Sequence, residues 1–235
     1  MGEVARPLAP VIVEQLPDES GSVREIFIEA LGYIGGEAAY QAVPLLREAL
    51  ADPATHDEAL SALSRIAGPE AADLAPELVT ALAEQSTGMC PHPTADGDLL
   101  AIGPVALPAV LEALADDSYG ARYSLLLMLD EWGDEALLEA APIFERWVEN
   151  RAAFALDGAE RLMQLGQLDA ARGLLVFNDA IGSINDWRRI RGAEGLMRLG
   201  GPDCARGREV LFEMLEHRHK KYRERAQTAL EHSCP

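Results

Sequence analysis

A thirteen-residue frame recurs along the chain at a nearly constant step and limits its fold more than any other feature. The clearest copy is VREIFIEALGYIG, residues 23–35, in which apolar side chains follow helical spacing and a glycine comes after the last of them. Later copies end at Gly68, Gly103, Gly133, Gly166 and Gly200, so the sequence numbers of the closing glycines increase by 33, 35, 30, 33 and 34. A glycine directly after a helix suits the left-handed conformation in which many helices end. The frame therefore predicts one kind of helix, ended by glycine, repeated along the chain.

Five prolines form a second set of markers between these frames. Each opens an apolar run such as PLLREAL, and their sequence numbers increase by 34, 32, 32 and 34: Pro10, Pro44, Pro76, Pro108 and Pro142. Two further steps reach Leu175 and Glu209, where the proline is absent but the apolar pattern persists. Two markers with one period predict a repeat of helix A, turn and helix B, about 33 residues long.

Seven such repeats account for the whole sequence. Their expected boundaries are 1–35, 36–68, 69–103, 104–133, 134–166, 167–200 and 201–235. A two-helix repeat cannot bury its apolar face alone, so neighbouring repeats must stack on one another. The predicted fold is all-α, an α-solenoid made of one continuous repeat array over residues 1–235, without strands.

Four features occupy fixed places in the repeat: a proline in helix A, Asp or Asn near the turn, Arg at the opening of helix B, and Ala-Leu-x-x-Ile-Gly at its end. The second and fourth repeats show them at Pro44, Asp52, Ala62, Leu63 and Ile66, and at Pro108, Asp117, Arg122, Trp132 and Gly133. On these features the chain resembles HEAT-repeat proteins of the short bacterial kind, similar to the phycobilisome-lyase type. The resemblance implies that B helices line the inner surface of the stack. It also implies that Arg24, Arg122 and Arg223 pair with Asp residues of the turns.

Charge is distributed unevenly along the chain. The net charge is −19, but residues 1–121 hold 4 Lys and Arg against 20 Asp and Glu, whereas residues 122–235 hold 16 against 19. From Ala180 onward, 11 basic side chains outnumber 8 acidic ones. Such an excess of carboxylates disfavours nucleic acid, where affinity depends on neutralising phosphates. It indicates either a solubility device or a basic protein partner for the acidic half.

Cysteines and hydropathy indicate the compartment. Cys90, Cys204 and Cys234 suggest no paired framework, and the N-terminus MGEVARPL lacks the apolar core of a signal peptide. We therefore expect a cytoplasmic protein. No apolar run approaches the roughly 18 residues of a membrane span, so no membrane association is expected.

Two stretches depart from the repeat. Residues 86–97, STGMCPHPTADG, lack helical periodicity, so helix B of the third repeat must be short. The stretch is either a tolerated insertion or a functional loop. Around Trp187, Arg188, Arg189 and Arg191 form the densest aromatic and basic cluster of the chain. Trp187 is either part of the core between helices, with the arginines solvated or paired with Asp186 and Glu194, or an interaction site.

Motifs for catalysis and metal binding are missing. The sequence has no GxSxG, P-loop, GxGxxG or HExxH. Cys90 and His92 offer two ligands where tetrahedral zinc needs four, and His217, His219 and His232 suit a solvated terminal helix better than a metal site. We expect no cofactor, no metal and no catalytic residue. An alternative is a small lyase or hydroxylase that uses residues 86–97 or the Trp187 cluster, since the phycobilin-lyase relatives keep a tetrapyrrole partner possible.

The architecture favours a non-catalytic scaffold or adaptor that binds a protein through its B helices. The apolar stripe of each frame is buried, so a partner would contact the variable positions. These are Glu25, Glu29, Tyr33, Asp57, Tyr123, Leu127, Asp130, Glu160 and Glu194, together with Trp187, Arg188 and Arg189 of the basic cluster. This carboxylate-rich set predicts a basic protein partner, with an inhibitor or immunity-type protein among the candidate settings. The sequence leaves the oligomeric state open.

Overall fold

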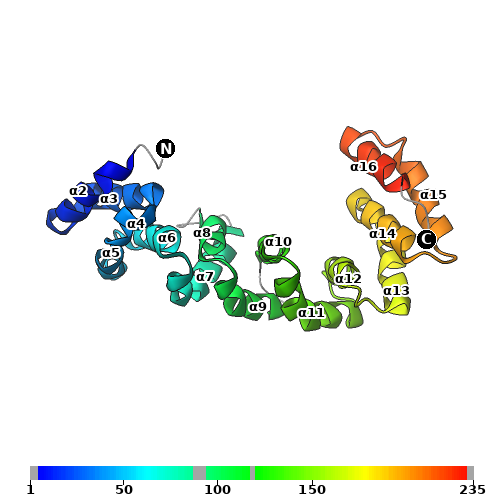
Figure 1. Ribbon diagram of the computed structural model, residues 1–235. Helices are drawn as coiled ribbons and strands as arrows, with labels where there is room; N and C mark the ends of the chain where they lie inside the picture. Colours follow the sequence, from blue (N-terminus) through cyan, green and yellow to red (C-terminus); the bar gives the residue numbers. More distant parts are fainter. Residues whose placement is uncertain (1–4, 87–93, 117–119, 232–235) are drawn as a thin grey trace. The chain divides into compact units, whose positions relative to one another are not determined.

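The computed structural model describes residues 5–86, 94–116 and 120–231, and these ranges are helical without a strand. The all-α prediction is therefore confirmed for the described part of the chain. The chain divides into two compact units, Met1–Ala136 and Leu137–Pro235. Each unit is built of helix pairs that follow one another in chain order (Figure 1). The seven repeat boundaries and the single continuous array stay a prediction.

The first or A helix of each repeat starts near the predicted place. The A helices are α2 (Ala9–Gln15), α4 with α5 (Gly36–Tyr40, Val43–Ala49), α7 (Ala75–Ser86), α9 (Leu107–Ala115), α11 (Asp134–Glu149), α13 (Ala170–Ile181) and α15 (Cys204–Met214). Pro10, Pro44, Pro76 and Pro108 are the second residues of their helices. A proline costs nothing there, because the first N–H groups of a helix have no intrahelical acceptor. Pro142 instead lies inside α11, since that helix already begins at Asp134.

The B helices coincide with the recurring frame. They are α3 (Gly21–Ile34), α6 (His56–Ala67), α8 (Ala95–Ile102), α10 (Arg122–Trp132), α12 (Ala155–Gln164), α14 (Asp186–Leu199) and α16 (Lys220–Leu230). With eight residues, α8 is as short as the irregular stretch before it predicts. Short 3-10 helices, η1 (Arg6–Leu8), η2 (Leu16–Asp18), η3 (Gly68–Leu74) and η4 (Pro104–Ala106), join some of the pairs.

Closing glycines end the B helices through their backbone conformation. Gly35, Gly68, Gly103, Gly133, Gly166 and Gly200 all have positive φ, between 53° and 91°. A Cβ at Gly103 would meet nothing within 4 Å, so conformation rather than space requires the glycine there. Only glycine adopts this region without strain, and this explains why the residue marks the period so regularly.

Side chains at the start of helix B bond to the end of helix A. Thr55 and His56 contact the carbonyl oxygens of Ala49 and Leu50 at 2.9 and 2.8 Å. In later repeats, Arg122 donates to the carbonyl of Asp116 at 2.6 Å, and Arg223 to that of His217 at 2.7 Å. The acceptor is six residues back in every case. These bonds satisfy carbonyls that a helix C-terminus leaves without an intrahelical partner.

Several consecutive B helices pack against one another inside each unit. In the N-terminal unit α3 contacts α6 and α6 contacts α8, while in the C-terminal unit α12 and α16 both contact α14. Buried leucine, isoleucine and alanine fill these contacts, among them Ile28, Leu31, Leu63, Leu99 and Leu196. This stacking places the outward residues of successive B helices side by side.

Two expectations about the environment meet the structure. Cys204 is disulfide-bonded, which the lack of a paired cysteine framework in the sequence does not predict. The cytoplasmic location stays a prediction. Among the described residues no single helix combines the length and apolar composition of a membrane span, although the bent pair Ala95–Ile102 and Pro104–Ala115 together meets those two criteria.

Candidate protein-binding surfaces

Predicted contact residues of the first repeat lie along one face of α3. Glu25, Glu29 and Tyr33 are four residues apart, which brings them to one side of a helix. Tyr33 is 63% exposed, and the guanidinium carbon of Arg65 on α6 lies 5.1 Å from the centre of its ring. Arg65 Nε in turn donates to Asp98 Oδ1 of α8 at 2.9 Å. The surface is thus tied together across three successive B helices, while Glu25 and Glu29 form no ion pair with another described residue.

The second repeat places Asp57 in the first turn of α6, half-buried beside His56. Both ring nitrogens of His56 face acceptors, since Nδ1 is 2.8 Å from Leu50 O and Nε2 is 2.6 Å from Glu77 Oε1. The bond to the Leu50 carbonyl, aided by Glu77 and opposed by burial, raises the pKa of His56 above its usual value. A protonated imidazole therefore fits this site best, as only that form donates from both nitrogens.

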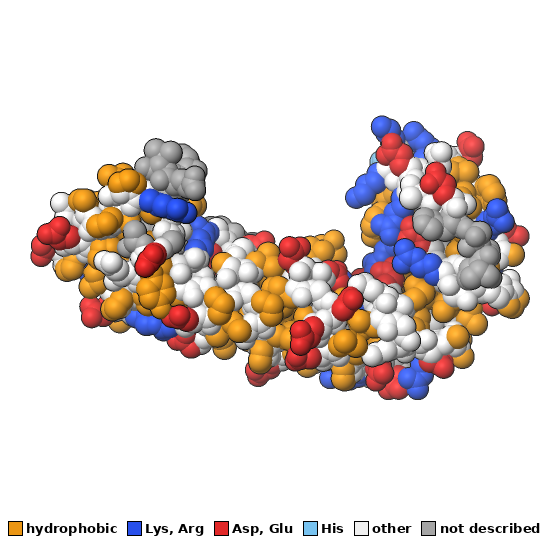
Figure 2. Space-filling model, viewed as in Figure 1, with side chains coloured by type: hydrophobic (Ala, Val, Ile, Leu, Met, Phe, Trp, Pro, Cys, Tyr) orange, Lys and Arg blue, Asp and Glu red, His pale blue; other side chains and the backbone are white. Residues whose placement is uncertain are grey.

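A hollow of about 370 Å³ lies between α8 and α10. Its apolar wall consists of Leu100, Leu127 and Met128, and Leu100 and Leu127 are 41% and 49% exposed. The carboxylates of Asp96, Asp130 and Glu131 line the same hollow. Tyr123, one helical turn before Leu127, is 67% exposed. Acidic and apolar side chains gather over α10 in Figure 2. We call this hollow the α8–α10 groove. It brings together the predicted contact residues Leu127 and Asp130 and adds Asp96, Leu100 and Glu131.

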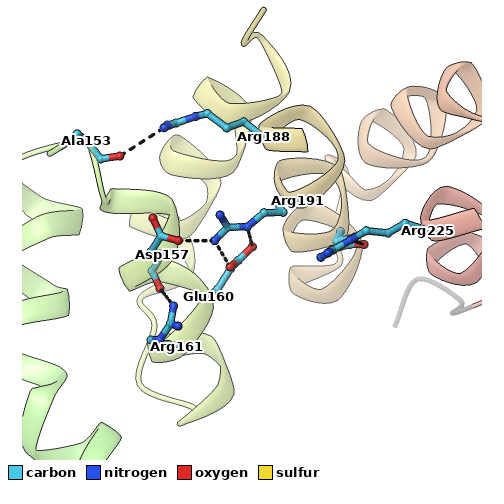
Figure 3. Close-up of polar contacts among 8 residues, drawn as sticks. Ala153, Asp157, Glu160, Arg161, Arg188, Arg191 and Arg225 are labelled. Atoms are coloured by element: carbon cyan, nitrogen blue, oxygen red, sulfur yellow. Dashed lines mark hydrogen bonds and ion pairs between the residues drawn. The ribbon is translucent and has the colours of Figure 1, made fainter. Parts of the chain in front are cut away.

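Glu160 belongs to a different arrangement, a ladder of ion pairs in the C-terminal unit (Figure 3). Arg191 on α14 donates from Nε to Glu160 Oε1 and from Nη2 to Asp157 Oδ1 of α12, both at 2.8 Å. One repeat further, Arg225 on α16 donates to both carboxylate oxygens of Glu194 at 2.7 Å. Burial lowers the pKa of Arg191, but its contacts with Glu160 and Asp157 outweigh that effect and raise it. Glu160 and Glu194 are therefore held by neighbouring repeats.

Trp187 lies half-buried on α14 and faces α16. The guanidinium carbon of Arg225 is 4.2 Å from the centre of the Trp187 ring system, and Lys221 Nζ is 4.9 Å away. These are cation–π distances. The adjacent arginines are also engaged within the chain: Arg188 donates to the carbonyl of Ala153 at 3.4 Å, and Arg189 contacts Glu213 at 2.8 Å and Asp186 at 3.5 Å. The arginines and Trp187 of the basic cluster thus join neighbouring segments within the C-terminal unit.

The register of the repeat explains the difference between the two units. Glu29, Glu160 and Glu194 all stand six residues before a closing glycine. In the C-terminal unit an arginine, Arg191, stands nine residues before the next closing glycine and reaches Glu160. In the second repeat that place is taken by Ala59, which is buried. Glu29 therefore occupies a ladder position whose arginine the chain does not supply.

The candidate metal ligands of the sequence are described only in part. Cys90, His92 and His232 lie outside the described residues. Within the described ranges no group of three or more His, Cys, Asp or Glu side chains could hold a metal ion. His217 Nε2 instead contacts Asp186 Oδ2 at 3.0 Å, and its Nδ1 accepts the backbone N–H of His219 at 3.1 Å.

The geometry of paired A and B helices defines a helical-repeat protein. Residues 9–86, which contain α2 to α7, match the family model for HEAT repeats, so the predicted resemblance is confirmed over that stretch. No curated protein matches the sequence. One solved structure, described as an engineered protein, is 19% identical, with 95% of this chain and 67% of that chain covered and a TM-score of 0.47. HEAT repeats generally serve as scaffolds for protein interaction.

Proposed function

We propose that this chain is a non-catalytic scaffold whose N-terminal unit binds a basic protein segment along the outward faces of α3, α6, α8 and α10. The observation that carries the proposal is the α8–α10 groove, where two exposed leucines and three carboxylates line one hollow. Protein contact sites combine an apolar centre with charges that fix orientation and partner choice.

The balance of charge in the N-terminal half supports a cationic partner. Residues 1–121 contain four Lys and Arg side chains, and two of them are already engaged: Arg47 with Asp73 at 2.8 Å and Arg65 with Asp98 at 2.9 Å. The remaining carboxylates far outnumber the cations that the chain could offer them. A basic partner would supply what the ladder arginines supply in the C-terminal repeats. An adaptor and an inhibitor or immunity-type protein both fit this chemistry.

Isothermal titration of the full chain with an octa-arginine peptide tests the proposal. We expect binding that weakens by about tenfold between roughly 50 mM and 300 mM salt, because the contacts are solvent-accessible ion pairs. The variant Glu25→Gln/Glu29→Gln/Asp57→Asn should bind at least about fivefold more weakly than wild type.

A matched control separates the surface from net charge. Glu14, Glu48 and Glu112 are exposed and lie on the A helices α2, α5 and α9. Changing these three to Gln removes the same charge and should leave the affinity within about twofold of wild type. Equal losses of affinity in the two triple variants, or an affinity that does not change with salt concentration, would reject the assignment of the surface.

A further inference from the structure

The α8–α10 groove has a composition that suits one kind of side chain. Its apolar wall is formed by Leu100, Leu127 and Met128, which suit an aliphatic stem, and the carboxylates of Asp96 and Glu131 suit a positive charge at the end of that stem. A purely apolar side chain would place no charge opposite these carboxylates. A short cation would leave the exposed leucines uncovered. Lysine and arginine are the residues that combine an aliphatic stem with a cationic tip.

The chain itself shows how a B-helix surface meets such a side chain. Arg191 reaches from α14 to α12 and places its guanidinium against Glu160 and Asp157, with only 15% of its side chain exposed. In α10 the residue in the register of Glu160, six before the closing glycine, is Leu127. The groove therefore offers an apolar contact where the C-terminal ladder offers a carboxylate, and its own carboxylates stand beside it.

We propose that the α8–α10 groove is the specificity pocket for a lysine or arginine side chain of the partner, with the aliphatic stem against Leu100 and Leu127 and the cationic tip at Asp96 and Glu131. This rests on the proposed function, since it names the side chain that the acidic surface selects. The groove then recognises the length of the partner's side chain as well as its charge, whereas the exposed carboxylates of α3 recognise charge alone.

The test compares two cationic octapeptides against the full chain by isothermal titration. Octalysine carries the long stem, and an octapeptide of 2,4-diaminobutyric acid keeps the charge but has a stem shorter by two methylenes. Because burial of each methylene contributes to binding, octalysine should bind wild type about fivefold more tightly than the short-stem peptide. Equal affinities of the two peptides would overturn the groove assignment.

Two groove variants locate the effect. Leu127→Ala should remove most of the preference for octalysine while changing the affinity for the short-stem peptide by less than about twofold. Asp96→Asn/Glu131→Gln should weaken the binding of both peptides by roughly fivefold. Val105→Ala is the matched control, since Val105 is 48% exposed on η4 and outside the groove lining, and it should change neither affinity.

The outcomes separate this inference from the function on which it rests. If octalysine binds in a salt-dependent way but its affinity is unchanged by Leu127→Ala and by Asp96→Asn/Glu131→Gln, the groove assignment is wrong and the proposed acidic scaffold is unaffected. If neither peptide binds wild type, both proposals are wrong. Circular dichroism of each variant checks that the helices are intact, so that a loss of affinity is not a loss of fold.

Discussion

Glu194 on α14 accepts two hydrogen bonds from Arg225 on α16, both 2.7 Å long, and the same relation joins Glu160 to Arg191 one repeat earlier. Both pairs are separated by 31 residues. The closing glycines Gly166 and Gly200 mark one full repeat, but Arg191 stands three residues further from its closing glycine than Glu160 does. The separation within each pair is thus the period of the repeat less about one helical turn. Because consecutive B helices stack on one another, residues with this separation lie close enough to form an ion pair.

Loss of Arg191 should destabilise the C-terminal unit strongly. Its side chain is 15% exposed, and its removal would leave Asp157 and Glu160, 18% and 24% exposed, close together without a cation. We expect Arg191→Met to cost about 3 kcal/mol of unfolding free energy, measured by urea denaturation followed by circular dichroism. Lys220→Met is the control, because Lys220 pairs with Glu224 at 3.2 Å with both side chains largely exposed, and it should cost less than about 0.5 kcal/mol. Similar losses in both variants would show that the ladder does not stabilise the stack.

Much of the fold was predictable because its markers act locally. A glycine with positive φ and a proline in the first helical turn depend only on the backbone of their own helix, so Gly35 and Pro44 indicate helix ends directly. The contacts of Trp187 with Arg225 and of Tyr33 with Arg65 depend on how neighbouring helices are rotated, which periodicity does not specify. The sequence does contain a signal for the ladder of ion pairs: a glutamate is followed by an arginine 31 residues later in both pairs, Glu160 with Arg191 and Glu194 with Arg225. The α8–α10 groove gave no such signal, since Asp96, Leu100 and Glu131 share no motif.

Asp98 should be the most sensitive carboxylate of the N-terminal unit. Its side chain is fully buried and accepts hydrogen bonds from Arg65 Nε at 2.9 Å and Thr94 Oγ1 at 2.8 Å. Asp98→Ala removes the acceptor for both donors and should lower the unfolding free energy by about 3 kcal/mol. Asp73→Ala is the comparison, because the exposed pair of Asp73 with Arg47 should contribute under about 1 kcal/mol. Urea midpoints that shift equally would contradict the role of burial.

Two glycine substitutions should act in opposite directions. A Cβ at Gly192 on α14 would lie 2.7 Å from Ala180 Cβ and 2.8 Å from Phe177 O, so α13 and α14 would have to separate. We expect Gly192→Ala to destabilise by about 2 kcal/mol despite the better helix propensity of alanine. At Gly97 on α8 a Cβ would meet nothing within 4 Å, and Gly97→Ala should stabilise by roughly 0.5 kcal/mol. Thermal denaturation of both variants measures the contrast, and a stabilising Gly192→Ala would show that the two helices pack less closely than described.

The paired contacts of His56 predict how stability depends on pH. The bond from Nδ1 to the Leu50 carbonyl comes first among the causes that raise the pKa of His56, burial opposes it, and the bond from Nε2 to Glu77 adds to it. In the unfolded chain this pKa returns to about 6.5. A group with a raised folded pKa contributes its full stabilisation below the unfolded pKa and loses it as the pH rises through the folded pKa. Relative to His56→Gln, the wild type should therefore have its full advantage below the unfolded pKa and should lose it as the pH rises from there through the raised folded pKa. Urea midpoints across this range measure the difference, and NMR titration of the His56 ring gives the folded pKa directly. Glu77→Gln removes one contact that raises the folded pKa of His56 and keeps the Leu50 bond, so the loss should be complete at a lower pH than in wild type. An advantage over His56→Gln that grows with pH would mean that the neutral ring is the form the fold prefers.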